Sequence, residues 1–206
     1  MPTPTGNENL AGALTMAQSI CWDETHGYVM GADMDPDTDC SGFIGYALSH
    51  NGFNVPQRWN TTSMIPTLQS YPGFTEIIWD PSTPLIHGDI LVYDEGGGAN
   101  GHTFFYAENV IGYTSNDPDL GDGTTGLLTR ARIEASNDRG RPQTGDQDNG
   151  YGMHPEVWVH PYSAPSTSHV WHLFRWNQSP IPGNIPVWLY SKFNKKRRYK
   201  DYDFNY

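Results

Sequence analysis

The chain has 206 residues, a mass of 23.1 kDa and a formal net charge of −11. This length suits one well-buried domain, and 7 Trp, 12 Tyr and 8 Phe give it enough apolar bulk for a core. Residues 1–190 contain 6 Arg and no Lys against 21 Asp and Glu, so this acidic body disfavours nucleic acid as a partner. The absence of any run of about 20 apolar residues excludes a transmembrane helix.

The N-terminus does not have the pattern of a secretory signal. Residues 1–9 include an acidic residue and no Lys or Arg, and polar residues and Gly interrupt residues 10–20. We therefore expect the product to stay in the cytoplasm of the cell that makes it unless another factor releases it. Residues 8–21 place apolar side chains at helical spacing and predict a first amphipathic helix.

Two further helices and a series of strands are predicted downstream. Asp and Pro dominate residues 33–39, so a second helix begins near residue 40, and a third fits residues 61–71. The pattern then changes to β-structure. Helices followed by strands predict an α+β fold, with the helices packed on an antiparallel sheet. The expected strands cover residues 74–79, 89–93, 102–113, 126–136, 157–162 and 170–176.

Cys40 is the candidate nucleophile because it opens the second helix. The free N–H groups and the dipole at a helix N-terminus favour the thiolate, which is the reactive form of cysteine. One alternative is a buried structural cysteine. A disulfide with Cys21, the only other cysteine, is sterically possible, although two cysteines do not make a disulfide scaffold.

His102 is the best candidate for the base that a cysteine nucleophile needs. It follows a glycine-rich loop and opens an apolar strand, so it can face a cleft at the edge of a sheet. Glu134 lies among apolar residues in a later strand and should have a partner, because a lone buried carboxylate is costly. An imidazole suits that role, and an ion pair with Arg132 or Arg139 is the alternative.

The order of these motifs resembles a known family. The segments from Asp39 to Thr103 resemble the papain-like NlpC-type cysteine peptidases and the related CHAP domains, and the later segments look like the branch of phage peptidoglycan amidohydrolases, which are endolysins or virion-associated lysins. The resemblance covers residues 10–176. Its motifs are Asp39–Phe43 (DCSGF), Gly88–Val92, Gly101–Thr103, Ile133–Ala135, Thr144–Gln147 and Glu156–Val157.

The resemblance implies a set of functional residues and a papain-like NlpC-type fold. Cys40 would be the nucleophile, His102 the base and Glu134 the third polar residue, with Asn137 as the alternate. The substrate would contact three further residues: Tyr28, which lines the cleft, Asp39, which can meet the free amine of a peptide, and Ser41. No metal ion or cofactor is required.

The implied function is hydrolysis of an amide bond in the peptide part of the bacterial cell wall, by an N-acetylmuramoyl-L-alanine amidase or an endopeptidase. Such a protein is made in the host cytoplasm and acts at the cell wall, in host lysis or as a virion component. The alternative is a non-catalytic virion structural or binding protein on the same fold. Residues 1–178 would form the hydrolase domain. Residues 179–206 would form a Pro-rich linker and a tail with the basic segment Lys192–Lys200. This tail is either a solvated terminus or a contact for an acidic partner, which is teichoic acid, an anionic membrane surface, another virion protein or the acidic body of this chain.

Overall fold

The computed structural model describes residues 2–21, 26–32, 34, 37–96, 100–112, 126–136 and 157–177. The alternate third residue Asn137, the predicted contact segment Lys192–Lys200 and the predicted domain boundary at residue 178 lie outside these residues. No helix within the described ranges is long and apolar enough to cross a membrane.

Three helices form where the sequence predicts them: α1 (Leu10–Cys21), α2 (Cys40–Ser49) and α3 (Thr61–Ser70). Helices α1 and α3 each bury one apolar stripe, as an amphipathic helix on a globular domain does, whereas α2 is buried on almost every side. Side chains fix the starts of α2 and α3. Asp39 caps α2, and Asn60 forms a capping box with Ser63 at the start of α3, which satisfies N–H groups that have no partner within the helix.

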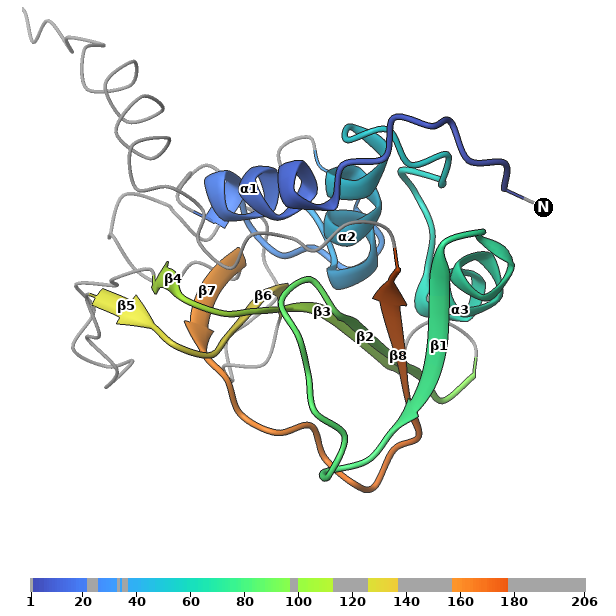
Figure 1. Ribbon diagram of the computed structural model, residues 1–206. Helices are drawn as coiled ribbons and strands as arrows, with labels where there is room; N and C mark the ends of the chain where they lie inside the picture. Colours follow the sequence, from blue (N-terminus) through green and yellow to red (C-terminus); the bar gives the residue numbers. More distant parts are fainter. Residues whose placement is uncertain are drawn as a thin grey trace, which may run out of the picture.

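The main sheet has six strands, and every neighbouring pair is antiparallel. All three helices pack on the same face of it (Figure 1). The predicted α+β class, with helices on an antiparallel sheet, is therefore confirmed. In spatial order the strands are β1 (Phe74–Trp79), β8 (Trp171–Trp176), β2 (Ile90–Asp94), β3 (Gly101–Ala107), β6 (Ala131–Ala135) and β7 (Val157–Pro161).

Two of the predicted strands are interrupted. The strand expected over residues 102–113 ends at Ala107 and resumes as β4 (Val110–Gly112), and the one expected over 126–136 divides into β5 (Gly126–Leu128) and β6. Asn109 adopts a φ of 52°, a left-handed conformation that no regular strand contains. As a result β4 and β5 form a separate two-stranded sheet.

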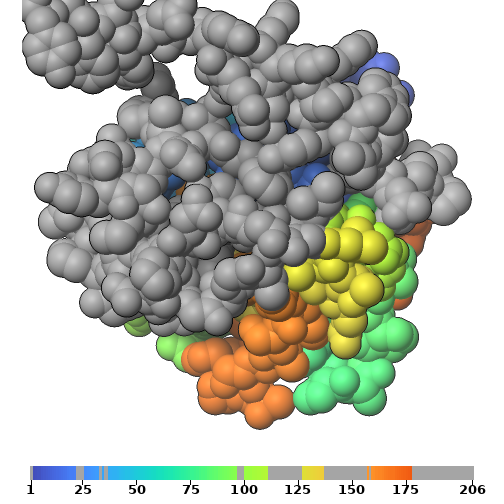
Figure 2. Space-filling model, turned by 90° about the vertical axis from the view of Figure 1, so that its left-hand side faces the viewer, coloured from blue at the N-terminus to red at the C-terminus, as the bar shows by residue number. Residues whose placement is uncertain are grey.

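Apolar side chains fill both faces of the main sheet. The larger cluster joins the helices to the side chains that point toward them, such as Phe105 and Ile133. A smaller cluster, which includes Phe104 and Trp171, lies on the opposite face. Strands β6 and β7 form one edge of the sheet, and Figure 2 shows residues 157–170 (orange) beside residues 126–136 (yellow) on that side of the molecule.

The close approach of α2 to the following loop predicts the effect of one substitution. In a helix interior, alanine is normally more favourable than glycine by about 1 kcal/mol. At Gly45, however, an added Cβ would lie 2.7 Å from Trp59 Nε1 and 2.8 Å from the carbonyl oxygens of Gln57 and Pro56. We expect Gly45→Ala to lower the free energy of unfolding by about 1–3 kcal/mol, measured by urea denaturation. The control Ser70→Ala, at an exposed position of α3, should change it by less than about 0.5 kcal/mol. A stabilising Gly45→Ala would contradict this packing.

Candidate active site

Cys40 is held at the first position of α2 by the residue before it. Asp39 has an extended backbone, with φ −102° and ψ 178°, and its carboxylate accepts hydrogen bonds from Gly42 N at 2.7 Å and Ser41 Oγ at 2.8 Å. The second carboxylate oxygen accepts a bond from Gly31 N at 3.0 Å. Asp39 therefore fixes both the start of the helix and the loop beside it. Its oxygens are already used within the protein, and its predicted contact with substrate stays a prediction.

Ser41 joins the same helix start to the segment before α3. Its single Oγ–H is shared between the Asp39 carboxylate, at 2.8 Å, and the Trp59 carbonyl, at 2.9 Å, and the Trp59 indole N–H donates to the Ser41 carbonyl at 2.6 Å. The side chain is buried, with 2% of the residue exposed. The structure thus gives Ser41 a part in holding the helix start, and its contact with substrate stays a prediction.

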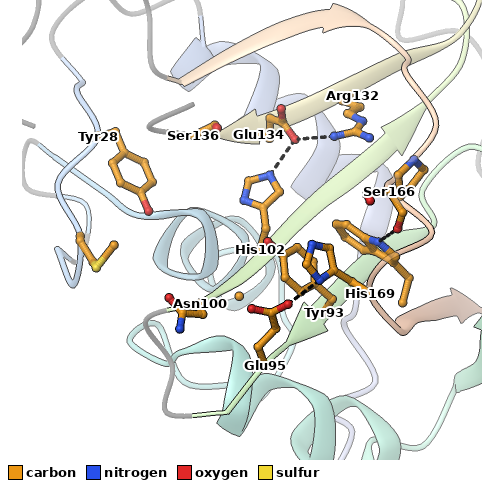
Figure 3. A pocket seen from close by; sticks show the side chains of 14 residues that line it. Tyr28, Tyr93, Glu95, Asn100, His102, Arg132, Glu134, Ser136, Ser166 and His169 are labelled. Carbon is orange, nitrogen blue, oxygen red and sulfur yellow. Dashed lines mark hydrogen bonds and ion pairs between the residues drawn. The ribbon is translucent and has the colours of Figure 1, made fainter. Parts of the chain in front are cut away.

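Tyr28 reaches the site because its loop pairs with the segment that precedes Cys40. Val29 N donates to the Thr38 carbonyl at 3.0 Å, and Thr38 N donates to the Gly27 carbonyl at 3.0 Å. These bonds form a short parallel bridge between Tyr28 and Thr38. The bridge brings the Tyr28 ring to the wall of a cavity, opposite His102 (Figure 3).

His102 and Glu134 come together because β3 pairs with β6. Phe105 lies opposite Ile133 in that pairing, which places the start of β3 beside the end of β6. Both of these residues point toward the helices, and side chains alternate between the two faces of a strand, so His102 and Glu134 share the other face. The His102 Nε2–H donates to Glu134 Oε2 at 2.9 Å (Figure 3).

The second oxygen of Glu134 has its own imidazole partner. His160 on β7 donates from Nε2 to Glu134 Oε1 at 2.7 Å. The guanidinium of Arg132 lies further away, with 3.6 Å between its NH1 nitrogen and Glu134 Oε2. An imidazole is therefore nearer to Glu134 than Arg132, which adds a longer ion pair. The other suggested partner, Arg139, lies outside the described residues.

Sequence reasoning did not select His160. It precedes a proline and lacks the glycine loop and apolar strand that single out His102. The only local signal is the pair of valines at alternate positions, Val157 and Val159. This pattern predicts one short strand, and His160 lies in it. The contact between His160 and Glu134 can be predicted only when this strand is known to lie next to β6. The register of two strands this far apart in the sequence cannot be predicted from local patterns.

The charges in this cluster reinforce one another. Burial by itself lowers the pKa of His102, but attraction to Glu134, together with a hydrogen bond and charge from the Cys40 side chain, raises it to about 10. Burial alone would raise the pKa of Glu134, yet His102 and His160 hold it well below its usual range. The site therefore favours an imidazolium at His102 and a carboxylate at Glu134.

The cysteines differ in their surroundings. Both are free thiols, so Cys40 is not joined to Cys21. At the end of α1, burial followed by the negative charge of Glu134 raises the pKa of Cys21 well above its usual value. Cys21 is therefore expected to stay protonated and unreactive, whereas Cys40 lies beside a cationic partner.

A cavity of about 490 Å³ opens beside His102 (Figure 3). His102, Glu134 and Tyr28 form part of its wall, whereas Cys40, with 5% of the residue exposed, does not. The cavity thus gives access to the imidazole and the carboxylate, whereas Cys40, at the start of α2, is not among its lining residues. The other lining residues are Met30, Tyr93, Glu95, Asn100, Gly101, Arg132, Ser136, Pro165, Ser166, His169 and Trp171.

The structure brings four of the predicted residues together: Cys40, His102, Glu134 and Tyr28. Within the described part of the chain, no group of three His, Cys, Asp or Glu side chains is arranged to hold a metal ion. No protein-family model and no curated protein matches this sequence.

The shifted pKa values predict how stability depends on pH. Because the pKa of His102 rises from about 6.5 to about 10 on folding, the stability that its proton contributes is complete below about pH 6.5 and is lost as pH rises through 10. Glu134, whose pKa is lowered, contributes only above about pH 4.5, its value in the unfolded chain. The wild type should therefore have a higher free energy of unfolding than His102→Gln. This difference should be largest between about pH 4.5 and about pH 6.5 and should shrink toward pH 10. Urea denaturation at several pH values measures it.

The matched control is His50→Gln, which removes an exposed imidazole at the end of α2 and should differ little from the wild type. If the difference between the wild type and His102→Gln were the same at about pH 6 and about pH 10, the ion pair assigned to His102 would be wrong.

Proposed function

We propose that the protein is a cysteine amidohydrolase in which Cys40, His102 and Glu134 act together. One observation carries the proposal: the His102 imidazole interacts on one side with Cys40, at the capped start of a helix, and donates on the other side to the buried carboxylate of Glu134. A nucleophile, a base beside it and a third group that orients the base are the parts that covalent acyl transfer needs.

The proposed reaction has two steps. The Cys40 thiolate attacks the carbonyl carbon of an amide, and the backbone N–H of Cys40 at the helix N-terminus stabilises the negative charge on the oxygen. The C–N bond then breaks, the protonated His102 gives its proton to the leaving amine, and a thioester remains on Cys40. In the second step His102 removes a proton from water, which attacks the thioester, releases the acid and restores the thiolate and imidazolium.

Bacterial peptidoglycan is the proposed substrate, on the basis of the sequence resemblance to phage peptidoglycan amidohydrolases. The cavity beside His102 is compatible with a polar peptide, because it contains aromatic, amide and charged side chains of both signs. In this proposal the protein has the papain-like NlpC-type fold and opens the cell wall for host lysis or virion entry.

A second candidate function is a non-catalytic binding or structural role in a virion. The observation that favours it is the burial of Cys40, which is 5% exposed and does not line the cavity. In that case the polar cluster would only stabilise the fold, and removing the thiol would leave the function of the protein unchanged.

Digestion of purified cell walls separates these two functions. Cys40→Ala and His102→Gln should each lower the rate of wall clearance by about a thousandfold or more, because each removes a group that takes part in bond making or proton transfer. Cys21→Ala, which removes the other buried thiol, should keep most of the activity. Mass spectrometry of the released muropeptides identifies the amide that is cut.

Unfolding must be measured on the same variants, because a loss of activity counts only if the protein still folds. Clearance by Cys40→Ala at the wild-type rate would contradict the proposed chemistry. A wild-type protein that releases no new amine or carboxyl ends from walls would favour the binding role.

A further inference from the structure

His160 contacts the site from the side opposite His102, and the reaction proposed above does not use it. Its Nε2 lies 2.7 Å from Glu134 Oε1, and its side chain is 10% exposed. The two oxygens of one buried carboxylate are thus divided between two imidazoles, one from β3 and one from β7.

We propose that His160 is a positioning residue, which holds the Glu134 carboxylate in the orientation that keeps His102 aligned with Cys40. The inference builds on the proposed function, since it assigns a role within the same site. It concerns the reactivity of the Cys40 thiol, however, so it can be tested without any cell-wall substrate.

The ring of His160 is itself fixed. Its Nδ1 lies 3.0 Å from the carbonyl oxygen of Pro161, and its Nε2 faces a carboxylate oxygen. A carboxylate oxygen can only accept, so Nε2 is the donor toward Glu134. The backbone of β7 is paired with β6, with His160 opposite Arg132. Because the His160 ring is held at both nitrogens and its strand is paired, it has little freedom to follow the Glu134 carboxylate if that group rotates.

Glu134 needs such a donor because a competing cation is close to it. The NH1 nitrogen of Arg132 lies 3.6 Å from the oxygen that accepts the His102 bond, while its Nε and NH2 nitrogens donate to the Ser163 carbonyl at 3.0 and 2.6 Å. If His160 were absent, Oε1 would be left buried without this bond, which is unfavourable. Rotation of the carboxylate toward Arg132 would relieve that cost and would weaken the bond to His102.

The charged and titratable groups around Glu134 define what a substitution at His160 changes. His102 faces it from β3, Arg132 from its own strand, and Cys21 from α1, while Cys40 acts through His102. A neutral side chain that still donates to Oε1 would preserve the orientation of Glu134 but remove any positive charge of His160. Glutamine is such a side chain, and leucine is not.

The test compares His160→Leu and His160→Gln in the full-length chain by the rate at which iodoacetamide alkylates Cys40. The rate is followed from about pH 6 to about pH 9, where ordinary thiols gain reactivity. Cleavage after Glu24 places Cys21 and Cys40 in different peptides, so mass spectrometry reads each thiol separately. Val159→Ala is the control, because it weakens the same strand on its helix-facing side without removing a bond to Glu134.

We expect His160→Leu to lower the alkylation rate of Cys40 at neutral pH roughly tenfold, as misplacement of a reacting group does, and His160→Gln to restore most of it. Val159→Ala should lower the melting temperature and leave the pH profile of alkylation unchanged. A wild-type profile in His160→Leu, or a loss in His160→Gln equal to that in His160→Leu, would overturn the proposal. If these profiles behave as expected but the wild type does not digest cell walls, the role of His160 stands and the proposed hydrolase function fails.

Discussion

The carboxylate of Glu134, shared between two imidazoles, is the interaction on which the rest of the site depends. It is 4% exposed, and a buried carboxylate is tolerated only when charged or hydrogen-bonding partners surround it. Its partners come from β3 and β7, the two strands that flank its own strand, β6. The order of these three strands therefore decides whether the charged groups stabilise one another or stand buried and unpaired.

The helix start supplies the other half of the site, and it is equally constrained. Asp39 caps α2 and binds the loop that carries Tyr28, while Ser41 exchanges hydrogen bonds with Trp59. Cys40 thus lies between two residues that are bonded to different segments, Asp39 to the loop at Gly31 and Ser41 to Trp59. This rigidity matters because a thiolate and an imidazolium lose their mutual stabilisation when either one moves. A fixed helix N-terminus and a fixed strand end keep them together.

Local patterns in the sequence were enough to predict the helices, most of the strands, and the candidate residues Cys40, His102 and Glu134. What they could not supply were the contacts that depend on register. His160 has no distinctive neighbours, and its role becomes visible only once β7 lies beside β6. The break in the predicted strand at Asn109 was also missed, because apolar residues continue on both sides of it. Asp39 and Ser41 were assigned to the substrate from the motif alone. Their side chains also bond within the protein, and their contact with substrate stays a prediction.

Nuclear magnetic resonance of the histidine side chains tests the central claim most directly. The ¹⁵N shifts of the His102 ring report whether it carries one proton or two, and they can be followed as pH rises in the wild type and in Cys40→Ala. The account predicts a doubly protonated His102 ring well above pH 8 in the wild type, since the pKa is raised to about 10. It also predicts a lower pKa once the Cys40 side chain is removed. A His102 ring that loses its proton near pH 6.5, the ordinary value for histidine, in both proteins would contradict it.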